Sequence, residues 1–357
     1  MGISFEINLL NGLTGDPAVC VNFSQSGESL LFDAGTLESL SNRELLKVRV
    51  VAISHAHVDH FIGFDRLIRV NIPHFRTVEV VGPKGITANI RGKLAGYTWN
   101  LLADGQVSFV VHEVARDGQV RSSHLSNTWN FEERPLSKAV SMDQPITEDK
   151  KWVCVPLQNS RYKLKATVVD HGTDVLAFCL SMPPSIGVQK EKLISSGLTP
   201  GPWISDLQTM AVNGDIRGYL DIDGSLHEAK DLALKLLQPK KGEQLVYVTD
   251  MVFSEANVRK LFDLVDHSPP DLLVCEANYR DEDRAKARDK SHLTSRQAAI
   301  IAAILGAKRL QIFHISNIYG GDSETSVRES AETLGKLGSL PSKELWELAS
   351  KEFVSPA

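Results

Sequence analysis

The stretch "ISHAHVDHFIGF", residues 53–64, places three histidines and an aspartate within six positions, directly after the apolar run "VRVVAIS". In an extended segment residues two apart point the same way, so His55 and His57 are predicted to share one metal ion. Asp59 and His60 then fall in the next turn and face a second ion. Zn²⁺ accepts imidazole nitrogen and carboxylate oxygen, and a catalytic site leaves one position to water. The motif therefore predicts two neighbouring cations.

Six residues cannot complete two coordination shells, so further ligands must come from elsewhere in the chain. Three polar residues each end an apolar, strand-like run: His171 after "LKATVVD", Asp250 after "LVYVT" and His314 after "RLQIF". Strand ends are where α/β folds gather their sites. Two ions that share a water lower its pKa toward neutrality, which produces a hydroxide nucleophile. The pattern thus predicts a dinuclear hydrolytic centre.

Length and composition indicate a globular protein. The chain has 357 residues, of which 42% are hydrophobic, and this is enough for one large α/β domain or two smaller ones. The formal net charge of -5 disfavours a uniformly positive surface, although a local basic groove could hold a polyanion. No apolar window reaches the length needed to span a bilayer, so no membrane insertion is expected.

The alternation of strand-like and helical stretches predicts an α/β fold with helices outside the sheets. After Leu245, the runs "LVYVTD", "DLLVCEANY" and "RLQIFHIS" are predicted strands separated by the helical stretches "SEANVRKLFDLV" and "TSRQAAIIAAILG". Residues at about 116–151 are polar and have neither period, which predicts an inserted loop. The passage at about 183–242 is rich in Pro and Gly and is predicted as an excursion. A single domain over residues 1–357 is expected.

The cysteines and the amino terminus bear on the cellular location. Cys20, Cys154, Cys179 and Cys275 form no C-x-x-C pair and mostly lie in apolar runs, which is typical of reduced core thiols. The first residues, "MGISFEINLL", lack a charged leader and a long apolar stretch. A cytoplasmic location is the expectation.

The order H-x-H-x-D-H, His, Asp, His resembles the metallo-β-lactamase superfamily. Within it the chain is most similar to the ribonuclease Z-like branch, the tRNA 3′-processing endonucleases and their phosphodiesterase relatives. The resemblance covers roughly Phe5 to Gly321 and includes "LLFDAG", "VEVVGPKGI" and "GLTPGPW". Its specific part is the series "CEA", "SHLT" and "HIS", which the lactam and thioester hydrolases do not share. The resemblance implies a four-layer αββα sandwich with the site at one edge.

The resemblance also implies a role for each candidate residue. One Zn²⁺ would be held by His55, His57 and His171, and the other by Asp59, His60 and His314, with Asp250 bridging the two; Mn²⁺ or Fe are alternative metals. The catalytic residues would be Asp59, His292 and Glu276. His292 would contact the scissile phosphate and protonate the leaving oxygen, and Glu276 would support it.

Physical chemistry agrees with these roles. Phosphodiester cleavage needs charge neutralised on the nonbridging oxygens and a proton for the leaving alkoxide. A histidine suits the second task, and a neighbouring carboxylate fixes its tautomer and favours its charged form. Thr294 or Ser295 is predicted to cap the helix "SRQAAIIAAILG", so that its positive end would face the same oxygens.

The first function predicted is therefore a dinuclear zinc-dependent phosphodiesterase that acts on a tRNA precursor, in a homodimer as is common in the family. The family's tRNA-binding arm lies between the third histidine and the bridging aspartate. Here that passage keeps "GLTPGPW", but "DIDGSLHEAKDLALKLLQPKKG" is partly helical in pattern. The alternatives are a small-molecule phosphodiesterase or another hydrolase of this fold, which needs no arm, and a metal-binding scaffold without catalysis.

Overall fold

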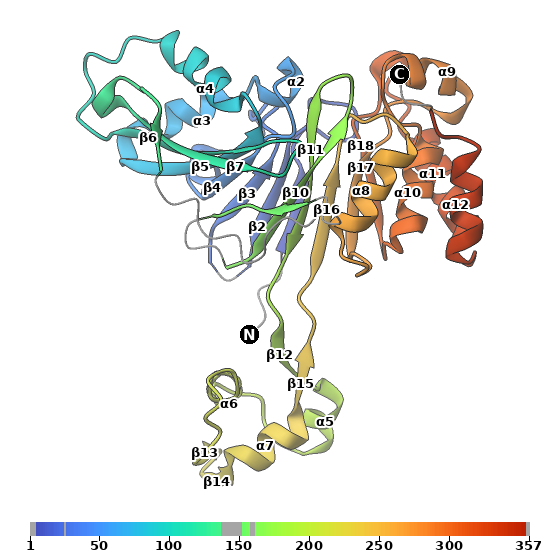
Figure 1. The fold of residues 1–357 in the computed structure, drawn as a ribbon. Helices are drawn as coiled ribbons and strands as arrows, with labels where there is room; N and C mark the ends of the chain where they lie inside the picture. Colours follow the sequence, from blue (N-terminus) through green and yellow to red (C-terminus); the bar gives the residue numbers. More distant parts are fainter. Residues whose placement is uncertain (1–4, 25, 137–151, 158–160, 355–357) are drawn as a thin grey trace. The chain divides into compact units, whose positions relative to one another are not determined.

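The computed structural model describes residues 5–24, 26–136, 152–157 and 161–354, and these form two compact units (Figure 1). The larger unit combines Phe5–Leu180 with Gln244–Ala357, and the smaller unit is Ser181–Glu243. The smaller unit contains the stretch at about 183–242 that was predicted as an excursion. The expectation of a single domain over residues 1–357 stays a prediction.

The first sheet of the larger unit has eight strands that lie side by side in chain order. They are β1 (Phe5–Leu9), β2 (Val19–Phe23), β3 (Ser29–Phe32), β4 (Val48–Ala52), β5 (Arg76–Pro83), β6 (Val107–Val114), β7 (Val120–Ser126) and β8 (Arg134–Pro135). The central strands β3 to β6 are parallel, whereas β1, β2, β7 and β8 pair antiparallel with their neighbours. Parallel strands end at the same edge, so β4 delivers the histidine motif there.

The second sheet has six strands in the order β18-β17-β16-β11-β10-β9. They are β9 (Val153–Cys154), β10 (Lys163–Asp170), β11 (Asp174–Ser181), β16 (Gln244–Val248), β17 (Leu272–Glu276) and β18 (Leu310–Phe313). The strands β16, β17 and β18 are parallel, and helical segments connect them. Their carboxyl ends therefore also meet at one edge.

Side chains alternate between the two faces of each sheet, and both faces are buried. In β3, Leu31 packs with the helices of the first sheet, whereas the ring of Phe32 stacks on that of Tyr247 from β16 with centroids 4.9 Å apart. In β16, Val246 and Val248 face the helices of the second sheet instead. Strands covered on both faces are typically continuous apolar runs, as these are. The layers are those of the predicted αββα sandwich.

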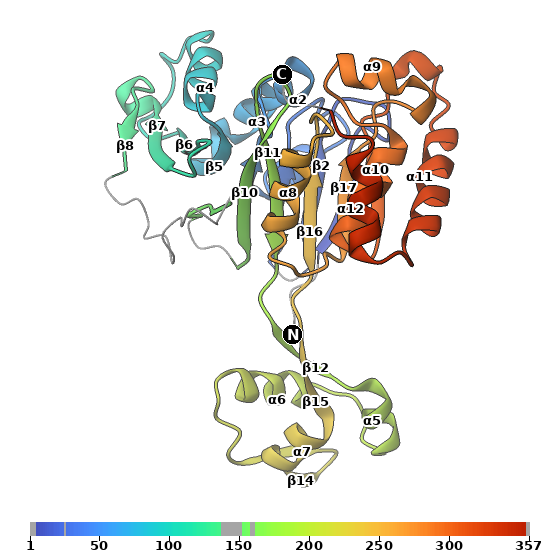
Figure 2. The ribbon, with the colours of Figure 1, turned by 45° about the vertical axis from the view of Figure 1, so that its right-hand side comes forward.

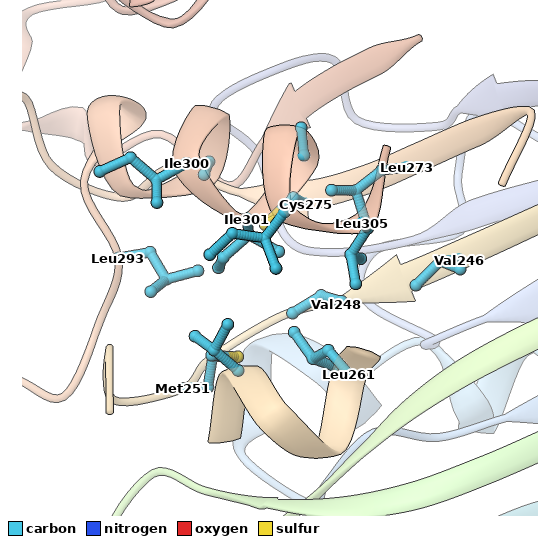
Figure 3. Close-up of a cluster of buried hydrophobic side chains, with 14 of the residues drawn as sticks. Val246, Val248, Met251, Leu261, Leu273, Cys275, Leu293, Ile300, Ile301 and Leu305 are labelled. Atoms are coloured by element: carbon cyan, nitrogen blue, oxygen red, sulfur yellow. The ribbon is translucent and has the colours of Figure 1, made fainter. Parts of the chain in front are cut away.

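Helices form the two outer layers (Figures 1 and 2). The first sheet is covered by α1 (Asn42–Leu45), α3 (Phe64–Asn71) and α4 (Ile86–Ala95), and α2 (Val58–Phe61) follows β4. The second sheet is covered by α8 (Glu255–Leu264), α10 (Ser295–Leu305), α11 (Glu324–Leu337) and α12 (Ser342–Ser350), while α9 (Arg284–Asp289) precedes α10. Figure 3 shows aliphatic side chains of β16, β17, α8 and α10 in contact. The C-terminal helix α12 thus packs on the core through Leu345 and Ala349.

The loop predicted at about 116–151 is wrong for residues 120–126, which form strand β7. This strand cannot be predicted from apolar alternation, because several of its buried positions are polar. Ser122 is buried, and its hydroxyl lies 2.8 Å from Nδ1 of His112 on β6. At these positions hydrogen-bonded polar side chains stand where a strand normally has apolar ones, so the usual alternation is missing. Residues 137–151 of the predicted loop lie outside the described residues.

The smaller unit has its own core. It consists of β12 (Ser185–Val188), α5 (Lys190–Ser195), α6 (Trp203–Val212), β13 (Tyr219–Ile222), β14 (Ser225–Glu228), α7 (Ala229–Leu236) and β15 (Leu237–Lys240). Leu207 and Leu236 are fully buried in it, and Trp203 is 6% exposed. Helix α7 confirms the helical pattern seen in "HEAKDLALKLL".

Two further expectations can be compared with the structure. Cys20, Cys179 and Cys275 are buried as predicted, but Cys154 is exposed at the short edge strand β9. Within the described ranges, no helix is both long enough and apolar enough to cross a membrane.

Candidate metal centre

All seven predicted ligands lie at strand ends or in the short helix that follows one. His55 follows β4, His57 is the N-cap residue of α2, and Asp59 and His60 lie in α2. His171 follows β10, Asp250 follows β16 and His314 follows β18. Both sheets of the sandwich thus supply residues to one site.

Asp250 lies at the centre of the group. Its Oδ2 is 3.7 Å from Nε2 of His55, 3.5 Å from Nε2 of His60 and 3.5 Å from Nε2 of His171. Its other oxygen, Oδ1, is 3.4 Å from Nε2 of His314. Only 2% of Asp250 is exposed. One carboxylate therefore faces four imidazole rings, which is the placement of a bridging ligand.

Three groups of donor atoms lie around this carboxylate, and two of them share no residue. Within each group the atoms lie within 4.8 Å of one another: His55, His57, His171 and Asp250 in one, and Asp59, His60 and His314 in the other. In the second group Oδ2 of Asp59 is 3.5 Å from Nε2 of His60 and 3.7 Å from Nε2 of His314. The third group consists of Asp250, His292 and His314, so His292 also lies close to donor atoms of the site.

Hydrogen bonds at Nδ1 orient three of the rings. Nδ1 of His60 lies 2.8 Å from Oδ2 of Asp33, and Nδ1 of His171 lies 2.7 Å from the carbonyl oxygen of Ser291. Nδ1 of His55 lies 3.0 Å from the hydroxyl of Ser54, which itself donates to Asp33. Carboxylate and carbonyl oxygens only accept, so Nδ1 carries the proton and Nε2 keeps its lone pair. This is the tautomer that binds a metal through Nε2.

Two buried atoms test whether a metal fits. Nε2 of His55 and Nε2 of His60 are buried and have no hydrogen-bond partner. A buried polar atom without a partner costs free energy, on the order of 1–3 kcal/mol. Both atoms point toward Asp250, in a set of imidazole nitrogens and carboxylate oxygens that suits Zn²⁺. The residues therefore fit a metal ion.

The electrostatics of the metal-free site point the same way. Burial, assisted by the neighbouring His60, lowers the pKa of His55 to about 2, so this ring is neutral. Burial would raise the pKa of Asp250, but His60 and His314 outweigh it and hold that pKa well below its ordinary value. Burial would also lower the pKa of His60, yet Asp250 and Asp33 raise it well above its ordinary value. Without a metal, the two carboxylates thus favour positive charge on the His60 ring, a charge that a bound cation would supply instead.

The predicted pair of His292 and Glu276 lies beside these groups. Nδ1 of His292 is 2.8 Å from Oε2 of Glu276, which is fully buried at the end of β17. The ring of His292 is 4.8 Å from that of His171 and 5.8 Å from that of His314, between centroids. Helix α10 begins directly after it, with Thr294 rather than Ser295 as the N-cap residue. The pair faces the space around Asp250.

Two residues that support the site have no predicted role, Asp33 and Tyr247. Asp33 lies in the quoted motif "LLFDAG", but only the folded chain shows that it accepts from His60. Its backbone has φ 57°, and Asp250 and His314 have φ 40° and 54°. Such left-handed conformations cost on the order of 1–3 kcal/mol each in residues other than glycine. The surrounding structure holds all three residues in them, at the strand ends where the site is built.

The four layers and the donor set define a class of protein, the metal-dependent hydrolases of the metallo-β-lactamase fold. The chain matches no family model. It is 31% identical over 294 residues to ribonuclease Z of Deinococcus radiodurans, which covers 81% of this chain and 83% of that relative. The chain belongs to the ribonuclease Z family.

A second relative agrees with this assignment, and a solved structure shares the fold. The chain is 26% identical over 309 residues to ribonuclease Z of Prochlorococcus marinus strain MIT 9301, which covers 85% of this chain and 83% of that relative. Among solved structures, it is similar to human tRNase Z, short form, with a TM-score of 0.51 and 19% sequence identity. That alignment covers 90% of this chain and 94% of the human chain, and it shows the common fold.

Proposed function

We propose that the protein is a dinuclear zinc-dependent phosphodiesterase that cleaves tRNA precursors at the 3′ end. The observation that carries the proposal is the position of Asp250, which lies within 3.7 Å of four histidines from both sheets. The relatives named ribonuclease Z support the choice of tRNA as the substrate.

In this proposal the two groups of donors each hold one cation. His55, His57 and His171 would hold the first, Asp59, His60 and His314 would hold the second, and Asp250 would be a ligand of both. When bound, the cations supply a water of lowered pKa as the nucleophile and neutralise charge on the phosphoryl oxygens. Zinc is proposed because imidazole and carboxylate ligands suit it, although Mn²⁺ and Fe accept the same donors.

Side chains of the protein would protonate the leaving oxygen. Nδ1 of His292 donates to the carboxylate of Glu276, which favours the charged ring, so Nε2 can hold a proton for donation. The first turn of α10 is capped within the protein, since the N–H of Ser295 donates to the carbonyl of Tyr279 and the N–H of Gln297 to the hydroxyl of Thr294, so no role toward the leaving oxygen is assigned to it. His292 is therefore proposed as the general acid and Glu276 as the group that keeps it charged.

The test compares two substrates. The zinc-loaded protein is incubated with a tRNA precursor that carries a 3′ trailer and, separately, with bis(p-nitrophenyl) phosphate. The proposal expects endonucleolytic release of the trailer as well as hydrolysis of the small ester. Hydrolysis of the small ester alone would favour a small-molecule phosphodiesterase, and inactivity on both would favour a metal-binding scaffold.

The proposal extends to assembly and location. We propose a homodimer, as is common in the family, which light scattering would detect as twice the chain mass of 39.3 kDa. We also propose that the enzyme works in the cytoplasm, where it would meet tRNA precursors. Cell fractionation with an antibody against the chain would test this location.

A further inference from the structure

Asp33 connects the metal centre to the interior of the sandwich. It is fully buried, and its Oδ1 accepts the backbone N–H of Ser54 at 2.6 Å. Its Oδ2 accepts the Ser54 hydroxyl at 2.8 Å, lies 2.8 Å from Nδ1 of His60, and accepts the hydroxyl of Tyr247 at 2.7 Å. Tyr247 is therefore the donor that reaches this carboxylate from the second sheet.

The hydroxyl of Tyr247 has little freedom to move. The residue is fully buried, and its ring stacks on that of Phe32 at 4.9 Å with an angle of 7° between the planes. On another side the ring of Phe313 lies 5.4 Å away, tilted by 39°. Since two packed rings hold the phenol, its O–H is directed at Asp33 by packing as well as by hydrogen bonding.

This contact reaches a ligand of the proposed second metal ion. A carboxylate that accepts several hydrogen bonds stays ionised and keeps a fixed orientation. Asp33 can then hold the proton of His60 on Nδ1, which leaves Nε2 free 3.5 Å from both Asp59 and Asp250. The partner of a metal-bound imidazole sets the orientation and basicity of the ring.

We infer that Tyr247 is a positioning residue for the second metal ion, which it stabilises through Asp33 and His60. The inference rests on the proposed metal centre and adds to it a residue from the interior of the opposite sheet. Tyr247 contacts neither the substrate nor the metal in this account. Its hydroxyl holds the Asp33 carboxylate in place, and Asp33 in turn orients the His60 ring so that its Nε2 lone pair faces the proposed ion.

The primary test is metal affinity, measured without any substrate. The chain is stripped with a chelator and titrated with Zn²⁺ against a chromophoric chelator, and with Co²⁺ followed by absorbance. In Tyr247→Phe, which keeps the stacked ring, one of the two ions should bind about 10- to 100-fold more weakly. The other ion should lose clearly less affinity, because among its ligands His55, His57 and His171 only His55 is linked to Asp33, and only indirectly through the Ser54 hydroxyl.

A control separates this role from the loss of a phenol–carboxylate hydrogen bond in general. Tyr319 also donates its hydroxyl to a carboxylate, Oδ2 of Asp283 at 2.8 Å, but neither residue belongs to the metal-binding groups. Tyr319→Phe should leave the affinity for both ions unchanged. A general loss of stability would instead weaken both ions together, and this result in Tyr247→Phe would overturn the inference.

A double substitution tests the route through Asp33. If Tyr247 acts on the metal only through this carboxylate, the double variant should bind the weakened ion less than about twofold more weakly than Asp33→Asn alone. If the two substitutions instead lower the metal affinity by independent factors that multiply, the inference is contradicted. It is also contradicted if Tyr247→Phe binds both ions with the affinity of the unaltered chain. If the unaltered chain fails to bind two ions, the metal centre itself is wrong, and this role falls with it.

Discussion

At the scale of single residues, His292 and His171 differ in what their Nδ1 atoms contact, whereas His60 resembles His292 in facing a carboxylate, that of Asp33. His171 donates to a backbone carbonyl, whereas His292 faces the buried carboxylate of Glu276 at 2.8 Å. A carbonyl favours a neutral ring with a free Nε2, and a carboxylate favours the charged ring. One histidine is thus suited to bind a cation and the other to hold a proton.

The first prediction concerns His292→Ala. Loss of a general acid should lower the rate of RNA cleavage by roughly 10²- to 10⁴-fold, because the leaving oxygen no longer receives a proton. The metal content should stay at two ions per chain when measured by inductively coupled plasma mass spectrometry. The control is His74→Ala, an exposed histidine in the 3₁₀ turn Ile72–His74. A parallel loss of zinc in His292→Ala would show that His292 is a ligand.

The second prediction concerns pH. Burial acts to lower the pKa of His292, but the charge and hydrogen bond of Glu276 outweigh it and raise the pKa to about 9 in the metal-free protein. The folded pKa exceeds the unfolded value of about 6.5, so this pair stabilises the fold fully below that pH. Its contribution, up to roughly 3 kcal/mol, is lost as the pH rises through 9.

Urea unfolding of the metal-free chain at a series of pH values measures this effect. The free energy of unfolding should fall between pH 6.5 and 9, and Glu276→Gln should remove most of that fall. Glutamine keeps the size of the side chain and one oxygen acceptor for the N–H groups of Met251 and Leu293. An equally steep fall in the variant would assign the pH dependence to other groups.

At the scale of elements, the start of α10 links stability to the site. Thr294 accepts the N–H of Gln297, and the Gln297 side chain accepts the N–H of Thr294, which completes a capping box. Both residues are buried, and the segment that holds His292 precedes the helix. The helix therefore fixes where that segment ends.

The third prediction is that Thr294→Ala lowers the free energy of unfolding by about 1–2 kcal/mol, because the first turn loses an N–H partner. Denaturant unfolding with the metal bound would measure it. Ser41→Ala offers a matched control, since Ser41 forms a capping box on the exposed turn of α1. The exposed cap should cost less, because water can replace the lost bond. Equal costs at the two caps would contradict this account.

At the scale of the whole molecule, the smaller unit Ser181–Glu243 is attached by two chain segments that lie side by side. The N–H of Met182 donates to the carbonyl of Glu243 at 2.9 Å. A two-residue turn can therefore join them in place of the unit. The unit contains seven Lys and Arg residues and eight Asp and Glu residues, so it carries no surplus of positive charge.

The fourth prediction is that replacement of residues 183–242 by Asn-Gly separates the two activities. Hydrolysis of bis(p-nitrophenyl) phosphate and the content of two metal ions should persist, because every proposed ligand lies in the larger unit. Cleavage of the tRNA precursor should fall on the order of tenfold or more, since remote binding energy is lost. Unchanged cleavage of tRNA would show that this unit is not an RNA-binding arm.

The sequence alone determined which residues are candidate ligands and which chemistry is proposed for them. Local backbone geometry explains why the spacing of the first four candidates, His55, His57, Asp59 and His60, suits metal binding. The other three can be predicted because each is a polar residue that ends an apolar run: His171, Asp250 and His314. The alternation of strands and helices predicted helices outside the sheets, whereas the four layers were implied by the resemblance to the family. Strand β7 could not be predicted, because hydrogen-bonded serines replace apolar residues inside it.

Only the tertiary structure decided which residues support the ligands. Asp33 and Tyr247 are 214 positions apart, and neither has a local pattern that points to the other. Their hydrogen bond exists because the two sheets pack face to face and bring β3 opposite β16. Local spacing can encode a turn or a strand end, but the contacts across a packed core depend on the arrangement of the whole chain.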